Sequence, residues 1–185
     1  LDALAACQPR EMIVALNDND EYFSGLHFDY PVRTVVGGRQ RSESVLNALK
    51  TVNATEDSLV LVHDGVRPCL RFEDIKALVT VLDAHPVGGC LAVPVRETVK
   101  RVNRDDVVAT LDRSQLWLAQ TPQVFRFGIL KQALTQFPDS TDEASAIEQL
   151  GLQPRVVQGH SDNIKITTGE DLVMAEVILK SRGRS

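Results

Sequence analysis

The chain has 185 residues, of which 43% are hydrophobic and 24% charged, and its formal net charge is -5. This length predicts one domain over residues 1–185, and the negative charge excludes a protein that binds nucleic acid through a basic surface. No apolar run approaches the roughly 20 residues of a membrane helix, so no membrane partner is expected. The cysteines lie far apart without metal-ligand spacing, which favours a reducing compartment, and we expect a cytoplasmic protein.

Short apolar runs alternate with helical patterns through the first half of the chain. The chain opens at Leu1 without a methionine, in a pattern typical of a helix, so we expect further residues to precede it. Buried strands that alternate with amphipathic helices predict an α/β fold, with a mostly parallel sheet covered by helices on both faces. Strands are predicted at residues 12–16, 33–36, 59–62 and 90–95, and helices at residues 42–52 and 72–82.

The alternation breaks at about residues 96–117, where two runs of period-two polarity predict a projecting β-arm. An isolated hairpin is only marginally stable in water. The arm should therefore pack on another surface, and a second copy of the chain is the partner we expect. The arm's strands are predicted at residues 97–102 and 107–111; beyond it come helices at 128–137, 142–150 and 170–180 and strands at 155–157 and 164–167.

Residues 37–44 join a predicted strand to a predicted helix and begin with two glycines. Glycines at such a turn allow a ligand to approach the backbone, and Ser42 or Ser44 could cap the helix behind it. Arg39 and Arg41 beside the glycines favour a ligand that carries phosphate. A glycine pair is also common before helices that bind no ligand, so this loop alone does not establish a binding site.

Residues 63–68 follow the most apolar predicted strand and hold more specific chemistry. Ligands of open α/β sheets bind beyond the carboxyl ends of the strands. Asp64 there presents a carboxylate for a sugar hydroxyl or a metal ion, and Arg67 a guanidinium for a phosphate. The alternative is a turn with a surface ion pair. We favour the ligand site, and expect His63 to brace the loop.

Two further segments carry charged or capping residues. Residues 141–145 begin a predicted helix, and a plain N-cap with an acidic first turn explains them well. Asp162 precedes the short strand predicted at residues 164–167, and Lys165 lies on it. A lone lysine on a strand is more often a surface residue than a catalytic one, so neither segment indicates a site by itself.

Taken together, six segments in this order resemble the 2-C-methyl-D-erythritol 4-phosphate cytidylyltransferases of the non-mevalonate isoprenoid pathway. The resemblance runs from about Val35 to the C-terminus, and its fold would be a Rossmann-like nucleotidyltransferase domain whose β-arm clasps a second subunit in a homodimer. The segments are GGRQRSESV, LVHDGVRP, PVRETVKR, LDRSQLWLAQTPQVF, TDEASAIE, and DNIKIT followed by GEDL.

The resemblance implies that the substrate phosphate attacks the α-phosphorus of CTP in line and that pyrophosphate leaves, with Mg²⁺ bound mainly through the CTP phosphates. Arg113, which would arrive from the partner's arm, and Lys165 would be catalytic. The nucleotide would be bound by Gly38, Arg39, Ser44, Asp64 and Gly65. Methylerythritol phosphate would be bound by Asp64, Val66, Arg67, Thr98, Arg113, Thr121, Thr141 and Lys165.

Two departures from the family pattern are visible. Many members carry an acid where this chain has Arg39, which puts a side-chain contact to the base in doubt. The family's glycine-rich loop, with the Arg and Lys that stabilise the transition state, lies N-terminal to the matched segments and is absent from these residues.

Two alternatives stay open at this point. One is a cytidylyltransferase for another polyol phosphate, such as ribitol 5-phosphate, which shares the loop around Asp64. The segments TDEAS and DNIKIT and the spacing of Arg113 and Thr121 suit the methylerythritol enzymes better. The other is a non-catalytic protein that binds a nucleotide or a phosphosugar.

Overall fold

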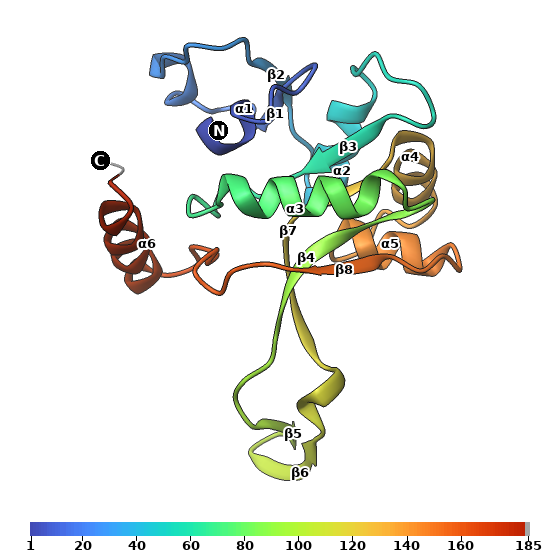
Figure 1. The fold of residues 1–185 in the computed structure, drawn as a ribbon, viewed down its shortest axis with the longest axis vertical. Coiled ribbons are helices and arrows are strands. Elements are labelled where there is room, and N and C mark those ends of the chain that lie inside the picture. Colours follow the sequence, from blue (N-terminus) through green and yellow to red (C-terminus); the bar gives the residue numbers. More distant parts are fainter. Residues whose placement is uncertain (184–185) are drawn as a thin grey trace.

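The computed structural model describes residues 1–183, so the last two residues of the predicted domain lie outside it. Its longest strand, β7 (Trp117–Arg126), runs between β3 (Leu59–Val62) and β4 (Gly88–Pro94) and is antiparallel to both. A fourth strand, β8 (Arg155–Gln158), pairs in parallel with β4 and completes the order β3-β7-β4-β8 (Figure 1). The α/β class is confirmed. The expectation of a mostly parallel sheet needs correction: β3, β4 and β8 share a direction, and β7 makes the sheet mixed.

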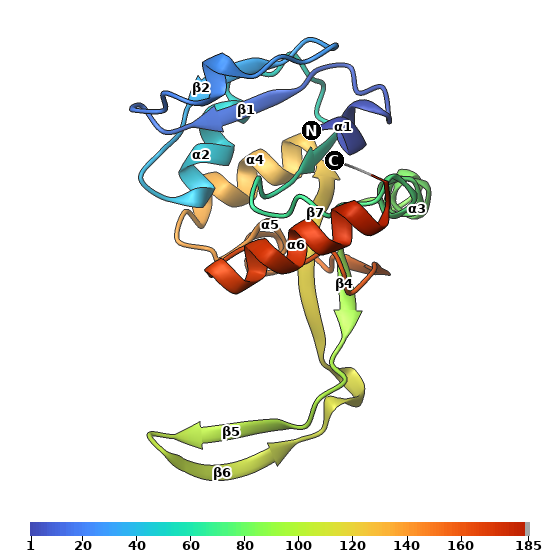
Figure 2. The same cartoon turned by 90° about the vertical axis from the view of Figure 1, so that its left-hand side faces the viewer.

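Helices cover both faces of this sheet, as predicted (Figure 2). Neighbouring residues of β7 enter different cores: Val124 packs with α3 (Phe72–Asp83), whereas Phe125 packs with α4 (Phe127–Gln136) and α5 (Glu143–Gln149). This period of two is what a strand buried on both faces requires. Among the described residues, no helix combines the length and apolarity needed to cross a bilayer.

A second, two-stranded sheet lies at the N-terminal side of the molecule (Figure 1). Its strands, β1 (Ile13–Leu16) and β2 (Arg33–Val36), are parallel and match the predictions for these segments. Helix α2 (Arg41–Leu49) follows β2 and contacts both strands. The first residues form a short helix, α1 (Asp2–Ala5), and a 3-10 turn spans Phe23–Gly25.

The predicted arm is present as an antiparallel ribbon of β5 (Val99–Asn103) and β6 (Asp106–Leu111). It projects well beyond the ends of β4 and β7, and the 3-10 turn Arg113–Gln115 leads back to the body (Figures 1 and 2). Large apolar side chains are exposed along it and at its foot, namely Val102, Val107, Val108, Leu111, Trp117 and Leu118.

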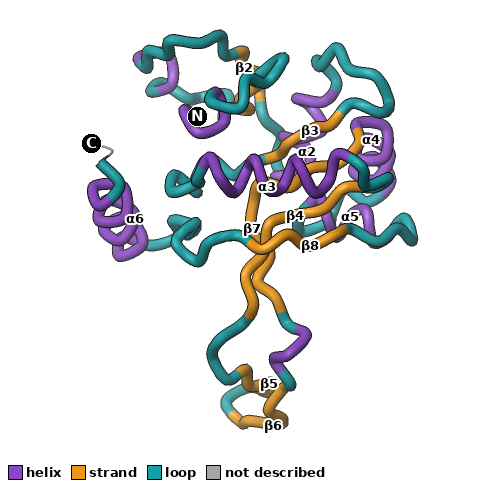
Figure 3. The backbone as a smooth tube through the Cα atoms, in the orientation of Figure 1, coloured by secondary structure: helices purple, strands orange, loops and turns teal. Residues whose placement is uncertain are grey.

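The predicted strand at residues 164–167 is wrong. Figure 3 draws the stretch between β8 and the last helix, α6 (Gly169–Ser181), as loop. Its backbone is held at Ile166, whose N–H donates to the carbonyl of Val66 at 2.8 Å. One such bond ties the segment to the loop after β3 without making a ladder.

The central strand β7 was not predicted, because its middle is polar and contains Pro122. Gln120, Thr121 and Gln123 are buried there, and each is hydrogen-bonded to a segment far away in the sequence. Pro122 lies where the β4–β7 register shifts, next to the last residue paired with β3. A proline is tolerated at such an irregularity, because no ladder bond is needed there.

The close approach of β4 to β8 depends on Gly89. A Cβ at this position would lie 1.8 Å from the carbonyl oxygen of Arg155, the residue paired with it. Gly89→Ala should therefore lower the free energy of unfolding by at least about 1–3 kcal/mol in urea titrations. Gly169→Ala is the matched control, because nothing lies within 4 Å of its Cβ. Equal stability of the two variants would contradict this account of the sheet.

Candidate active site

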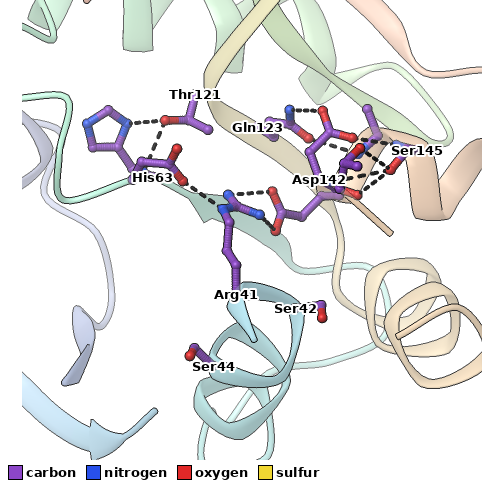
Figure 4. A network of polar contacts seen from close by, with 12 residues as sticks. Arg41, Ser42, Ser44, His63, Thr121, Gln123, Asp142 and Ser145 are labelled. Carbon is purple, nitrogen blue, oxygen red and sulfur yellow. Dashed lines mark hydrogen bonds and ion pairs between the residues drawn. The ribbon is translucent and has the colours of Figure 1, made fainter. Parts of the chain in front are cut away.

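Five segments bring polar side chains together beside the carboxyl ends of β2 and β3. They are the start of α2, the loop after β3, the middle of β7 and the start of α5, which Figure 4 shows, and residues 162–167 before α6. Segments distant in the sequence thus meet where a Rossmann-like sheet places its ligands.

Asp64 is the carboxylate at the centre of this cluster, and its side chain is only 10% exposed. Its Oδ1 accepts a hydrogen bond from Arg41 Nε at 2.7 Å, and its Oδ2 accepts one from Lys165 Nζ at 3.0 Å. Burial alone would raise the pKa of Asp64, but the hydrogen bonds from Lys165 and Arg41 hold it below its ordinary value. Asp64 is therefore ionised at neutral pH.

Arg41 joins Asp64 to a second carboxylate. Its Nη1 and Nη2 donate to the two oxygens of Glu143 at 2.6 and 3.0 Å, while Nε holds Asp64. Burial opposes the charge of Arg41, but these two carboxylates raise its pKa above the ordinary value. The expectation that Arg41 favours a phosphate ligand therefore needs revision, because its guanidinium is bound by protein carboxylates.

His63 braces the loop after β3, as expected. Its Nε2 lies 3.0 Å from the carbonyl of Arg67, and its Nδ1 lies 3.0 Å from Thr121 Oγ1. The same Thr121 hydroxyl accepts the backbone N–H of Asp64 at 3.1 Å. Burial lowers the pKa of His63 to about 4, so the ring is neutral at physiological pH.

Arg67 and residues 162–167 close the cluster on its far side. Arg67 Nη1 donates to the carbonyl of Asn163 at 2.7 Å, and the buried Asn163 amide donates to the carbonyl of Thr121 at 2.8 Å. Asp162 takes no part, because it pairs with Arg71 and Arg182. These bonds set the path of the backbone that carries Lys165.

The glycine loop is organised differently from the sequence expectation. No serine caps α2: its N-cap is Gln40, which makes no side-chain cap. Ser44 Oγ instead accepts the N–H of Gly38 at 2.9 Å. Glu43 accepts the N–H of the exposed Arg39 at 2.7 Å, and its side chain lies so close that a Cβ on Gly38 would be 2.2 Å from Glu43 Cγ. Gly38 therefore permits the tight turn.

The start of α5 has an N-cap and an acidic first turn, as its pattern predicted, and the N-cap residue Asp142 forms a capping box with Ser145. Asp142 accepts the N–H of Ser145 at 2.9 Å, and the Ser145 hydroxyl lies 3.2 Å from the Asp142 nitrogen. Gln123 on β7 binds this helix start, because its amide donates to Asp142 at 2.8 Å and accepts from the Ala144 N–H at 2.8 Å. Thr141 is exposed beside it, with Ser145 as its side-chain contact.

The structure brings some of the predicted site residues together and leaves two of them apart. Asp64, Gly65, Val66, Arg67, Thr121 and Lys165 belong to the cluster, and the loop with Gly38, Arg39 and Ser44 adjoins it through Arg41. Thr98 and Arg113 lie on the exposed arm, where Arg113 donates to the carbonyl of Arg96. Their roles, and those of the clustered residues, stay predictions.

Three residues of the cluster were missed: Gln123, Glu143 and Asn163. Arg41 was singled out in the sequence, but for a phosphate ligand and not for the carboxylates that it binds. Glu143 looks like an ordinary acidic first turn, and its partner lies 102 residues away.

The low pKa of His63 makes stability depend on pH. The unfolded chain protonates this histidine near its ordinary pKa of 6.5, whereas the folded chain does so only near 4. The neutral His63 ring therefore contributes fully to the free energy of unfolding above pH 6.5. This contribution, at most about 3 kcal/mol, is lost as the pH falls to 4. His63→Gln should lose less stability than the wild type between pH 7.5 and 4.5 in urea titrations. The exposed His27→Gln should behave as the wild type; equal losses for both variants would refute the assignment.

Comparison with known proteins identifies the family of the chain. The family model described as "IspD: 2-C-methyl-D-erythritol 4-phosphate cytidylyltransferase" matches residues 1–181. Enzymes of that name from Chromobacterium violaceum and Hahella chejuensis are 45% and 47% identical to the chain. The matches cover 93% and 92% of this chain and 79% and 74% of those proteins.

Solved structures agree. The 2-C-methyl-D-erythritol 4-phosphate cytidylyltransferase from Francisella tularensis has a TM-score of 0.80 and 38% identity, over 91% of this chain and 80% of its own. That from Thermus thermophilus has a TM-score of 0.83 and 26% identity, over 97% and 86%. Fold, segment order and sequence identity thus place the chain in the 2-C-methyl-D-erythritol 4-phosphate cytidylyltransferase family.

Proposed function

We propose which residues of this chain bind the nucleotide and which bind the attacking phosphate in the reaction of its family. The chain is a CTP-dependent nucleotidyltransferase that transfers a cytidylyl group to 2-C-methyl-D-erythritol 4-phosphate in isoprenoid biosynthesis. The observation that carries the proposal is the pair of cations, Arg41 and Lys165, on the two oxygens of Asp64 beside the glycine loop.

Lys165 binds the attacking phosphate in this proposal. An oxygen of the methylerythritol phosphate forms a bond to the α-phosphorus of CTP, the bond from that phosphorus to the β-phosphate oxygen breaks, and pyrophosphate leaves. Two anions must approach for this step, and a fixed ammonium offsets their repulsion and directs one oxygen. The side chain of Lys165 is 43% exposed and is held from one side by Asp64, which leaves its other side open to a phosphate.

The nucleotide occupies the glycine loop. With no side chain at Gly65, the sugar can approach the backbone closely there, whereas the Glu43 side chain fills the corresponding space at Gly38. Nothing in the described residues lies within 4 Å of a Cβ on Gly65, which is consistent with an open surface there. Ser44 holds the Gly38 amide and so sets the shape of this loop.

A homodimer supplies the remaining residues. Arg113 and Thr98 lie on the arm, and the arm extends away from the body of its own chain (Figure 2). The apolar side chains exposed on both arm strands need cover that residues 1–183 do not provide. We place the arm across a second copy of the chain, with Arg113 on that copy's substrate phosphate.

Magnesium accompanies CTP in this scheme. Among residues 1–183, no three His, Cys, Asp or Glu side chains gather to hold a metal ion, and both oxygens of Asp64 are taken by cations. The chain's own carboxylates thus do not fit a protein-held Mg²⁺ site. The ion would be held by the CTP phosphates, whose charge it would neutralise, and no step above depends on it.

A cytoplasmic location is proposed on the state of the cysteines. Cys7, Cys69 and Cys90 are all free thiols, and Cys69 and Cys90 are buried. Free, buried thiols are typical of proteins from reducing compartments.

The choice of alcohol phosphate can be measured directly. The full-length protein, given CTP and Mg²⁺, should release pyrophosphate with methylerythritol phosphate at a kcat/KM at least about tenfold above that with ribitol 5-phosphate. Equal or reversed preference would overturn the substrate assignment. No pyrophosphate with either alcohol would favour the non-catalytic alternative, and Lys165→Ala is the background control.

The dimer can be tested by complementation. Arg113→Ala and Lys165→Ala proteins should each be nearly inactive, and their heterodimer should contain one site with both residues. Random subunit exchange should therefore restore about a quarter of the wild-type activity. Exchange between two Arg113→Ala samples is the control and should restore none. A monomeric wild type in light scattering, or proven heterodimers without activity, would contradict the arm exchange.

A further inference from the structure

Arg41 occupies a place that local helix stability does not explain. It is the first residue of α2, where the helix dipole disfavours a positive charge. Figure 4 shows its side chain pointing from the start of the helix into the centre of the polar network, away from Ser42 and Ser44. The side chain is 31% exposed and donates from all three guanidinium nitrogens. Its position is therefore explained by the contacts that it makes from α2 to Asp64 after β3 and to Glu143 on α5.

Glu143 can act on the site only through Arg41. Its side chain is 0% exposed, so no ligand reaches it, and both of its oxygens accept hydrogen bonds from Arg41. A buried carboxylate is tolerated when a charged partner with matching geometry satisfies it. Glu143 thus fixes the guanidinium plane and the position of Nε.

Asp64 links the position of the Arg41 guanidinium to that of the Lys165 ammonium. The Arg41 Nε contact sets the rotation of the Asp64 carboxylate, because the other oxygen then faces Lys165 at 3.0 Å. Lys165 lies in a segment without regular structure, so its ammonium has few other restraints. The four charges alternate from the buried Glu143 to the exposed Lys165, and only the Lys165 end is open to a phosphate.

We propose that Arg41 is a positioning residue: anchored on Glu143, it orients the Asp64 carboxylate and thereby the Lys165 ammonium that binds the attacking phosphate. The inference rests on the proposed function, which assigns Lys165 to that phosphate. Arg41 also shares the charge of Asp64, which leaves the Lys165 ammonium partly uncompensated for the incoming anion. Substitution of Arg41 should therefore impair use of the alcohol phosphate, while CTP binding is preserved.

The test is a double-mutant cycle on kcat/KM for methylerythritol phosphate. Arg41→Lys keeps a positive charge but cannot reproduce the planar fork, so it should lower kcat/KM about tenfold or more. The KM for CTP should stay within about threefold. In the Asp64→Asn background the same substitution should cost less than about threefold, because Arg41 acts through Asp64. A merely structural arginine would instead give the same loss in both backgrounds.

Controls keep the outcomes distinct. Arg33→Lys, at the Arg33–Glu11 ion pair outside the cluster, is the matched control and should leave all kinetic constants near wild type. If Arg41→Lys does not fold, Glu143→Gln replaces it in the cycle, with the same non-additivity expected. Additive losses, or an Arg41→Lys enzyme equal to wild type, would overturn the inference alone. A wild-type chain that releases no pyrophosphate would overturn the proposed function and the inference together.

Discussion

The candidate site depends on one buried ion pair, between Glu143 at the start of α5 and Arg41 at the start of α2. A carboxylate without solvent exposure is costly unless its partner satisfies both oxygens, and the fork of Arg41 does so. Removal of Arg41 would leave the buried charge of Glu143 uncompensated, whereas removal of Glu143 would leave Arg41 paired with Asp64 alone. The pair therefore fixes the distance between two helices and, through Arg41 Nε, the carboxylate of Asp64.

The buried polar residues of β7 likewise hold parts of the site in place, from the central sheet. Gln123 holds the cap of α5, and Thr121 holds both His63 and the backbone of Asp64. A strand of purely apolar residues could not make these bonds to the loop after β3. These hydrogen bonds satisfy the buried side chains of Thr121 and Gln123 and make the central strand a rigid support for the site.

Patterns that reside in neighbouring residues were predicted well. The apolar β-branched runs at residues 33–36 and 59–62 are strands with those bounds, and the arm and the helices lie where their periodicity indicated. Residues 164–167 alternate in polarity like a strand, yet one backbone hydrogen bond, from Ile166 to the carbonyl of Val66, replaces the ladder of a sheet. Local alternation cannot report whether a neighbouring strand is available.

What the sequence could not predict are contacts between distant residues. The burial of Gln120 is possible because its amide donates to the carbonyl of His160, and that of Glu143 because Arg41 lies opposite. Such polar residues look like loop or surface until their partners are known. Asp64 was recognised, because the carboxyl end of a central strand is a ligand position whatever the partners.

The pKa of Asp64 tests the central claim most directly. Titration of its side-chain carbon signal by NMR, assigned with the Asp64→Asn variant, reports whether two cations hold the carboxylate. The account predicts a pKa below the ordinary value of 3.8, because the hydrogen bonds from Lys165 and Arg41 outweigh the effect of burial. A pKa at or above 3.8 would show that burial dominates, and would contradict the arrangement of charges described above.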